Sequence, residues 1–245
     1  MEVDSSKLFH QSSKDRFRGH QPVPEKYEDW PEEWKATHYK IYPRLLKIGL
    51  DDGPPSADFF DLIKARRSSR DFHHGAVLNK HELSILLKYS CGTKEIRAGK
   101  TRRAQPSGGG QFPIEVYPII FRSGADLETG LYHYNVKEHN LDTLWTREFS
   151  GDQIDELFSY TWVKNAAAVI IMTGVFQRNQ SKYGERGYRM ILQESGHIAQ
   201  NMYLISTALN LKCCSLIGTK DQALEELIDI DGITESVVYA FAVGK

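Results

Sequence analysis

The sequence has few cysteines, and their placement argues against two kinds of cysteine chemistry. Its 245 residues include only three, Cys91, Cys213 and Cys214. The odd count, and the poor geometry of an adjacent pair for a disulfide, indicate reduced thiols. No CxxC motif or Cys/His cluster has metal-ligand spacing, so we predict no metal site.

Long apolar runs and net charge are also missing. No stretch approaches 18 consecutive apolar residues, and the amino terminus lacks the apolar core of a signal peptide. The formal net charge is -1, so no overall basic field attracts nucleic acid or anionic lipid. We therefore expect a cytoplasmic protein without nucleic-acid or membrane partners. A globular composition of 40% hydrophobic and 26% charged residues can supply a core deep enough for a cofactor.

The first 55 residues differ from the rest because they are rich in tryptophan and proline. The residues concerned are Pro22, Pro24, Trp30, Pro31, Trp34, Pro43, Pro54 and Pro55. Such a segment seldom forms regular structure, yet its aromatic content indicates that it packs on a surface. We predict that residues 1–55 form an arm over the body or over a partner subunit, bracing the dimer rather than docking a peptide. Residues 56–245 then form the main domain.

The main domain mixes helical and strand-like patterns without a strict βαβ repeat. The predicted helices cover residues 57–66, 79–89, 152–160, 189–211 and 221–228. The second is opened by Asn79 and Glu82 at capping-box spacing. The predicted strands cover residues 115–122, 130–136, 166–173 and 237–243. Pro118 suggests an edge or a bulge in the first strand, and the third reads as a strand buried on both faces. The predicted class is α+β.

Three stretches suit a phosphorylated, planar cofactor. Residues 66–70, RRSSR, end a helix and offer forked, charge-assisted hydrogen bonds to a phosphate. The alternative is a solvated basic helix end. Residues 105–113, QPSGGGQFP, contain three glycines that let backbone N–H groups approach a ligand closely. The alternative here is a surface loop, and the motif is neither a P-loop nor GxGxxG.

A third stretch, residues 182–189, opens with Lys182 and Tyr183. Adjacent lysine and tyrosine suit proton transfer, because burial or a neighbouring cation can bring either pKa toward neutrality. Taken alone, such a pair is more often two ordinary surface residues. Glu194 and His197 lie three apart on the following helix and could form a second site pair. Structural polar contacts are the better interpretation of that pair.

The order of these stretches resembles the nitroreductase superfamily. The shared parts are the Arg-rich helix end with Phe72, the Gly-rich loop running into residues 112–117, FPIEVY, and residues 194–201, ESGHIAQN. Arg102-Arg103 before the loop and residues 182–189, KYGERGYR, resemble its SagB/McbC/cyanobactin-oxidase group of azoline dehydrogenases. The resemblance runs from about residue 8 to the carboxyl terminus. It implies a mostly antiparallel central sheet flanked by helices, in an intertwined homodimer that binds FMN at its interface.

The resemblance also implies a role for individual residues. The phosphate and ribityl chain of FMN would be held by Arg66, Arg67, Ser68 and Arg70. The flavin ring would be bordered by a loop of the partner subunit, Pro106, Ser107, Gly108 and Gly109. The turn passing near the reactive flavin nitrogen would be Leu216, Ile217 and Gly218, and Lys245 would lie near the phosphate. Lys182 would be the base that oxidises a thiazoline or oxazoline to an azole, with Tyr183 orienting or relaying the proton.

Three functions from different classes follow. The first is an FMN-dependent dehydrogenase acting on a peptide or small heterocycle in natural-product maturation, beside a biosynthetic-complex partner such as a cyclodehydratase. The second is an NAD(P)H-dependent nitro- or quinone reductase, which would not need Lys182. The third is a non-redox scaffold in a biosynthetic complex, against which the Arg cluster and the Gly-rich loop both count.

Overall fold

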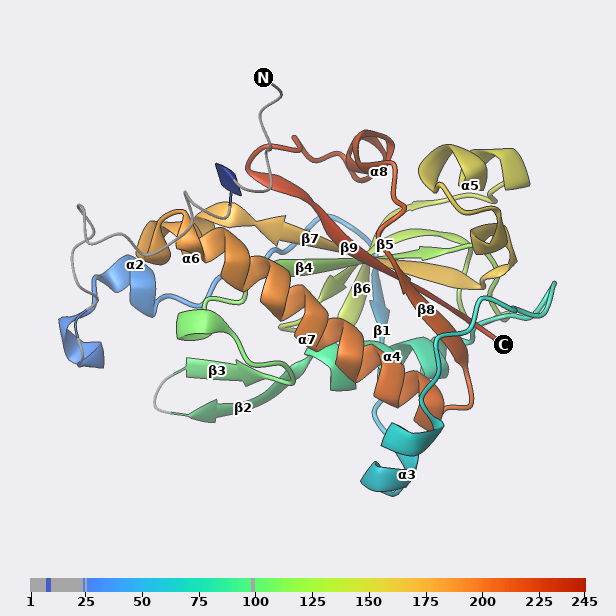
Figure 1. Cartoon of the computed structure of the whole chain (residues 1–245), viewed down its shortest axis with the longest axis horizontal. Coiled ribbons are helices and arrows are strands. Elements are labelled where there is room, and N and C mark those ends of the chain that lie inside the picture. Colours follow the sequence, from blue (N-terminus) through green and yellow to red (C-terminus); the bar gives the residue numbers. More distant parts are fainter. Residues whose placement is uncertain (1–7, 10–23, 25, 98–99) are drawn as a thin grey trace.

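A single antiparallel sheet forms the centre of the computed structural model, which describes residues 8–9, 24, 26–97 and 100–245 (Figure 1). The seven strands run in the order β1-β6-β5-β4-β7-β9-β8, and every neighbouring pair is antiparallel. Their bounds are β1 Lys47–Gly49, β4 Ile114–Ile120, β5 Gly130–Asn135, β6 Asn140–Thr146, β7 Ala168–Val175, β8 Lys212–Leu216 and β9 Glu235–Gly244. A separate ribbon pairs β2, Thr93–Arg97, with β3, Lys100–Arg103. The predicted α+β class with an antiparallel sheet is confirmed.

Five of the described helices lie where the sequence pattern predicts them, and two, α2 and α6, were not predicted. The helices are α2 Glu32–Lys35, α3 Phe59–Ala65, α4 Lys80–Cys91, α5 Gly151–Leu157, α6 Phe176–Tyr183, α7 Arg186–Ala208 and α8 Asp221–Ile228. The capping box that opens α4 is present, with Glu82 N donating to Asn79 Oδ1 at 2.8 Å and Asn79 N donating to Glu82 Oε2 at 3.0 Å. Because α6 and α7 are separated only by a short turn at Gly184, the 182–189 motif spans the junction between two helices.

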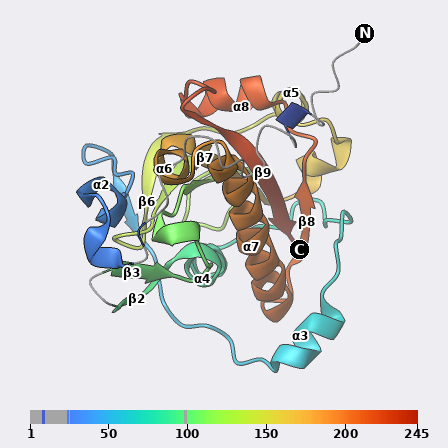
Figure 2. The ribbon, with the colours of Figure 1, turned by 60° about the vertical axis from the view of Figure 1, so that its left-hand side comes forward.

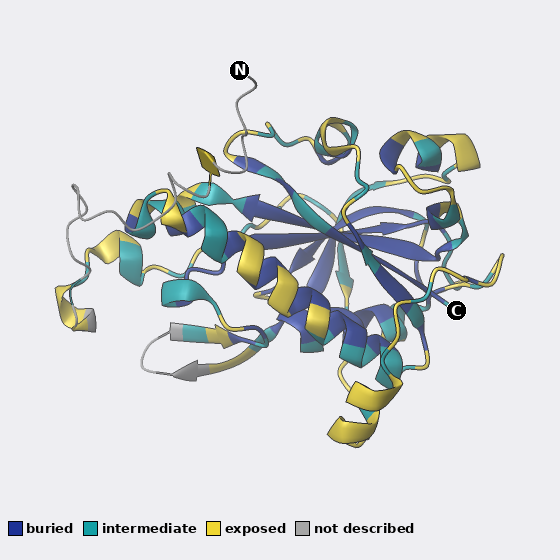
Figure 3. Cartoon of the chain, viewed as in Figure 1, coloured by how far each residue is buried: buried dark blue, intermediate teal, exposed yellow. Residues whose placement is uncertain are grey.

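The sheet carries a hydrophobic core on each face. Along β7, Ile170 and Met172 face the core shared with α4 and α7, whereas Val169 and Ile171 face the core under α5 and α8. This alternation is the period of two expected for a strand covered on both sides, as predicted for this apolar run. Figure 2 shows α4 and α7 together on one face of the sheet, and Figure 3 shows the strands buried between the layers.

Two local predictions are wrong. Pro118 does not mark an edge or a bulge, because β4 lies between β5 and β7 and its register with β7 is continuous. The proline is tolerated because β5 pairs with β4 only at Ile119 and Ile120, beyond Pro118. The segment before residue 56 also contains more regular structure than predicted, since β1 adds an edge strand to the sheet beside β6.

The arm is joined to the sheet by charged contacts. Lys47 of β1 forms an ion pair with Asp142 of β6, and Lys40 Nζ lies 2.6 Å from Glu235 Oε2 of β9. All three cysteines are buried and none forms a disulfide, as predicted. Within the part of the chain that the structure describes, no helix has the length and apolar character needed to cross a membrane.

Candidate functional site

The Arg-rich stretch after α3 lies against β8 and the carboxyl-terminal half of α7. Ser69 N donates to Cys213 O at 2.8 Å, which aligns the stretch with β8. Ser68 Oγ donates to Tyr203 Oη at 3.0 Å, and the Arg66 guanidinium lies 5.3 Å from the centre of the Tyr203 ring. Tyr203 therefore fixes two of the predicted phosphate-binding residues beside the end of β8.

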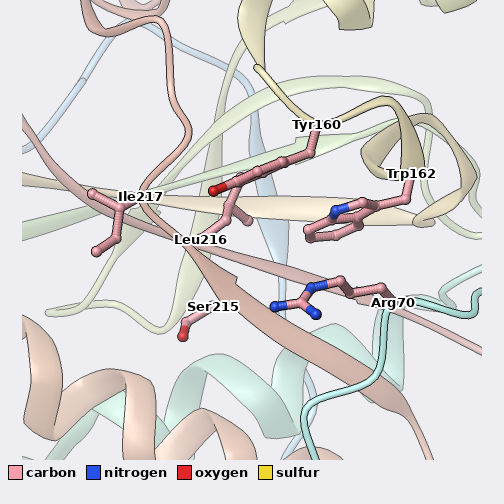
Figure 4. Close-up of a pocket in the computed structure, with 6 residues that line it drawn as sticks. All are labelled: Arg70, Tyr160, Trp162, Ser215, Leu216 and Ile217. Atoms are coloured by element: carbon pink, nitrogen blue, oxygen red, sulfur yellow. The ribbon is translucent and has the colours of Figure 1, made fainter.

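A cavity of about 430 Å³ opens next to this stretch. It is lined by Arg70, Tyr160, Trp162, Ser215, Leu216 and Ile217 (Figure 4). The Tyr160 and Trp162 rings are stacked, with centroids 5.7 Å apart and an interplanar angle of 16°. Figure 4 shows the Arg70 guanidinium directed into the space below Trp162 and toward Ser215. The structure thus brings Arg70 and the 216–218 turn together around a cavity with aromatic walls and a cation.

Gly218 is the last residue of this turn, and a side chain there would collide with Tyr160. A Cβ at Gly218 would overlap the Tyr160 ring, so glycine is what allows the turn and the ring to approach. A flat space bounded by aromatic rings and a guanidinium suits a planar ligand that carries negative charge. The residue types and the shape therefore fit a phosphorylated aromatic cofactor.

Two predicted cofactor residues have other contacts in this structure. Arg67 is exposed, and its Nη1 donates to the carbonyl oxygens of Lys64 and Arg66 at 2.8 and 2.9 Å. Lys245 Nζ lies 2.9 Å from Glu82 Oε1 of α4. Neither side chain is among those that line the cavity beside Arg70.

The Gly-rich loop packs against α6 and the start of α7. Gly109 and Gly110 have φ of 64° and 66°, a left-handed conformation that favours glycine. A Cβ at Gly109 would lie 2.6 Å from Tyr183 Oη and 3.1 Å from Lys182 Nζ. The structure therefore brings the predicted loop and the predicted Lys-Tyr pair into direct contact, which sequence separation alone does not reveal.

Lys182 is buried beneath the aromatic residues of the arm. It is 7% exposed, and its Nζ lies 2.9 Å from the centre of the Trp30 ring and 5.5 Å from that of Trp34. Trp34 is tied to the loop because Gln111 Nε2 donates to its carbonyl oxygen at 2.9 Å. Burial raises the pKa of Tyr183 above its ordinary value of 10.0, so its phenol stays protonated at neutral pH. For Tyr183, the predicted shift of the pKa toward neutrality is therefore wrong.

Three residues near this pair, Trp30, Trp34 and Asn179, were not identified as site residues in the sequence analysis. Trp30 and Trp34 were assigned to the arm, and only the fold places them over Lys182. Asn179 is fully buried, and neither of its amide atoms has a hydrogen-bond partner among the described residues. It lies three positions before Lys182 on α6, so helical spacing could have found it. Glu194 is 2% exposed whereas His197 is exposed, so these two do not form the pair considered above.

The two groups of site residues lie near opposite ends of α7. Tyr203 contacts Ser68 at one end, and at the other end the Met190 side chain fills the space where a Cβ of Gly108 would lie. These helix residues are 13 positions apart, which is about 20 Å along the axis. Within one chain, the two groups of predicted site residues are therefore well separated. Among the described residues, no group of three or more His, Cys, Asp or Glu side chains is arranged to hold a metal ion.

The fold is α+β, and the residues that line the cavity beside Arg70 fit a planar, anionic ligand. Residues 63–245 match the Nitroreductase family, and the chain belongs to that family. It is 30% identical over 170 residues to the nitroreductase homologue MJ1384 of Methanocaldococcus jannaschii, a match that covers 69% of this chain and 83% of that protein.

Two further relatives are peptide-processing proteins by name. The chain is 33% identical over 172 residues to the trifolitoxin-processing protein TfxB of Rhizobium leguminosarum bv. trifolii, covering 66% of this chain and 46% of TfxB. It is 29% identical over 145 residues to the microcin B17-processing protein McbC of Escherichia coli, covering 54% of this chain and 50% of McbC. The matches thus span about half the length of each of these two relatives.

Solved structures share the fold at lower identity. The E. coli microcin synthetase McbBCD complex with truncated pro-MccB17 aligns with a TM-score of 0.61 and 20% identity, over 98% of this chain and 91% of that chain. A nitroreductase-family structure from Exiguobacterium sibiricum that contains FMN aligns with a TM-score of 0.55 and 15% identity, over 78% of this chain and 89% of that chain. At these identities the likeness establishes the fold alone.

Proposed function

We propose that this protein is an FMN-dependent oxidoreductase that dehydrogenates a thiazoline or oxazoline to the aromatic azole in the maturation of a peptide or related natural product. The observation that carries the proposal is the position of Lys182, a buried amine beside the Gly-rich loop and Tyr183 and beneath Trp30. Aromatising an azoline removes a hydride equivalent and a proton, so the reaction needs a base shielded from water.

The residues around the aromatic-lined cavity would hold the cofactor. Arg66 and Arg70, with Ser68, would bind the phosphate and ribityl chain through charge-assisted hydrogen bonds. The stacked Tyr160 and Trp162 rings and the 216–218 turn would flank the planar ring. When bound there, FMN supplies the acceptor for the hydride equivalent.

The Lys-Tyr pair would handle the proton. Lys182 Nζ would accept it from the azoline carbon, and the tryptophans above it would keep water away from that atom. Tyr183 keeps its own proton because burial raises its pKa, so it would donate a hydrogen bond that orients the substrate or relays the proton. Gly109 leaves room for both side chains to reach the same space.

The complete site would need two copies of the chain. The two groups of site residues, about 20 Å apart along α7, would be joined if the loop of one copy, with Pro106, Ser107, Gly108 and Gly109, met the cavity of the other. α7 carries an exposed stripe that includes Leu192, Gly196 and His197. Nearby, α3, which is largely yellow in Figure 3, exposes Phe59 and Phe60, whose exposed fractions are 58% and 70%. Apolar exposure of this kind supports a homodimer.

An NAD(P)H-dependent nitro- or quinone reductase is the second candidate, favoured by the family match alone. The buried Lys-Tyr pair distinguishes the reductase from the azoline dehydrogenase, because hydride transfer to a nitro group or a quinone does not require proton abstraction by Lys182. The names of the relatives TfxB and McbC support a role in peptide processing, in which a biosynthetic-complex partner would be expected.

The test combines cofactor analysis with one variant and a matched control. We expect the purified protein to release stoichiometric FMN and to oxidise a synthetic azoline peptide. Lys182→Ala should keep FMN and lose about 100-fold or more in azoline oxidation, because only the proton step is removed. Alanine at Lys94, which is exposed, should change neither property. Full turnover by Lys182→Ala, or reduction of nitro compounds without any azoline oxidation, would reject the proposal in favour of the reductase.

A further inference from the structure

The carboxyl group of Glu194 lies behind the Gly-rich loop and has no part in the proton step proposed above. It is buried on α7, and its Oε1 accepts a hydrogen bond of 3.2 Å from Gln105 Nε2, at the start of the loop. The Ser107 hydroxyl lies close enough to lower the pKa of this carboxyl, and it also accepts a hydrogen bond of 2.9 Å from Phe112 N, at the end of the loop. Glu194 is therefore connected to the start of the loop through Gln105, and to its end through Ser107.

The same loop links Glu194 to the proposed base. Gly109 stands two positions after Ser107, at the place where the loop contacts Tyr183 and Lys182. These contacts are possible only because Gly109 has no side chain, so the loop backbone has little free space between itself and the side chains of Tyr183 and Lys182. A movement of the loop by a few tenths of an ångström would change how Lys182 is packed.

The environment of Glu194 is close to balanced between its charged and neutral forms. Burial raises the pKa of Glu194 to about 7, although the surrounding groups act against that rise. The groups that face it from the packed elements are Ser107 and Gln105 of the loop, Arg103 of β3, Arg178 of α6 and the Cys91 thiol of α4. Glu115 of β4 in turn faces both arginines. A pKa near 7 means that the ionised and neutral forms of Glu194 coexist near neutral pH, so its ability to accept hydrogen bonds changes there.

We propose that Glu194 is a positioning residue: its ionised carboxylate holds the Gly-rich loop, residues 105–112, against Lys182 and Tyr183, and the loop loosens when the carboxyl is protonated. The inference rests on the proposed function, since it gives the loop its purpose in that reaction. Hydrogen bonds to an ionised carboxylate are roughly twice as strong as those to a neutral acceptor. A protonated carboxyl also turns one of its oxygens into a donor.

The direct test is hydrogen exchange of the loop amides in the purified full chain, which needs neither azoline nor turnover. After correction for intrinsic exchange, protection of the amides at positions 107–112 should rise about tenfold as the pH is raised through neutrality in the wild-type protein. Glu194→Gln should keep its fold and show no such rise, and Glu194→Asp should restore part of it. Protection that is independent of pH in the wild-type protein would overturn the inference by itself.

A neighbouring titratable residue provides the control. His197 is exposed on the same helix, three positions after Glu194. His197→Ala should leave the pH dependence of loop protection unchanged. If His197→Ala abolishes it while Glu194→Gln does not, the histidine and not Glu194 controls the loop.

The kinetic readout separates this inference from the proposed function. If azoline oxidation occurs, its kcat should rise with pH through neutrality in the wild-type protein. In Glu194→Gln this rise of kcat should be absent, and KM should be unchanged. If azoline oxidation fails but protection of the loop amides still rises with pH, the proposed substrate is wrong and the positioning role of Glu194 is supported. If azoline oxidation occurs and Glu194→Gln leaves its pH profile intact, Glu194 has only a structural role.

Discussion

Three arginines that look equivalent in the sequence have different surroundings in the fold. Arg70 lines the cavity and Arg66 lies over the Tyr203 ring, whereas Arg67 donates to nearby carbonyl oxygens. If the cavity takes the phosphate end of FMN, Arg66→Ala and Arg70→Ala should each weaken FMN binding about 10- to 100-fold, because each removes a charge-assisted contact. Arg67→Ala should have little effect. Fluorescence titration of the apoprotein with FMN measures all three, and equal losses would contradict this distinction.

Gly109 is the residue whose lack of a side chain matters most for the Lys-Tyr pair. Its φ of 64° and the 2.6 Å separation between its missing Cβ and Tyr183 Oη both oppose substitution. Gly109→Ala should cost about 1–2 kcal/mol of stability and reduce azoline oxidation about 10-fold or more, since Lys182 and Tyr183 must move. Urea unfolding and steady-state kinetics provide the measurements. Activity at the wild-type level would show that the loop does not fix the pair.

At the scale of elements, the exposed stripe of α7 allows a test of the homodimer. No atom outside its own helix lies within 4 Å of a Cβ placed at Gly196, so no other element of the chain packs closely against the helix at this position. In a monomer, Gly196→Ala should stabilise α7 by about 0.5–1 kcal/mol. In a homodimer packed at this stripe, it should instead weaken association. Sedimentation and thermal unfolding distinguish the two outcomes, and we expect the second.

The same elements show what sequence could predict and what it could not. α4, α7 and β7 were predictable because a capping box, an apolar helical stripe and a continuous apolar run each act locally. The position of Pro118 inside the sheet was not predictable from the sequence. Whether β5 pairs with β4 at Pro118 depends on the register of a hairpin that is distant in the sequence. The contact between Gly109 and Lys182 depends on the packing of segments more than 70 positions apart. Resemblance suggested that both belong to one site, but only the fold brings Trp30 over them.

At the scale of the whole molecule, a buried set of charges joins the arm to the sheet. His133 of β5 is fully buried, 2.9 Å from Glu115 of β4 and 3.2 Å from Asp142 of β6. Asp142 also pairs with Lys47 of the arm, and Glu115 lies 2.5 Å from Arg178 of α6. A chain of alternating charges therefore runs from the arm through the sheet to the helix that carries Lys182. Removing one member would leave its partners buried without compensation.

This charge network should give the protein a narrow pH range of greatest stability. Burial lowers the pKa of His133, but the hydrogen bonds of this side chain to Asp142 and Glu115 outweigh burial and raise the pKa above 6.5. The stabilisation that His133 contributes is therefore present below pH 6.5 and is lost as the pH rises through the folded pKa. Burial raises the pKa of Glu115, but Arg178 and His133 outweigh burial and lower the pKa from 4.5 to about 2. The stabilisation that Glu115 contributes is therefore lost as the pH falls from 4.5 to about 2.

We therefore expect the free energy of unfolding to be greatest between 4.5 and 6.5, the ordinary pKa values of these two groups. It should fall on both sides by on the order of 1 kcal/mol. Glu194 adds a loss in the same direction at lower pH, between its ordinary pKa of 4.5 and its folded pKa of about 7, so stability within this range should be highest near 4.5. Urea unfolding of Glu194→Gln, which keeps the network, should retain only the His133 decline above 6.5. His133→Gln should be about 3–5 kcal/mol less stable and retain only the Glu194 part. An alkaline decline that neither variant reduces would place the titrating group elsewhere.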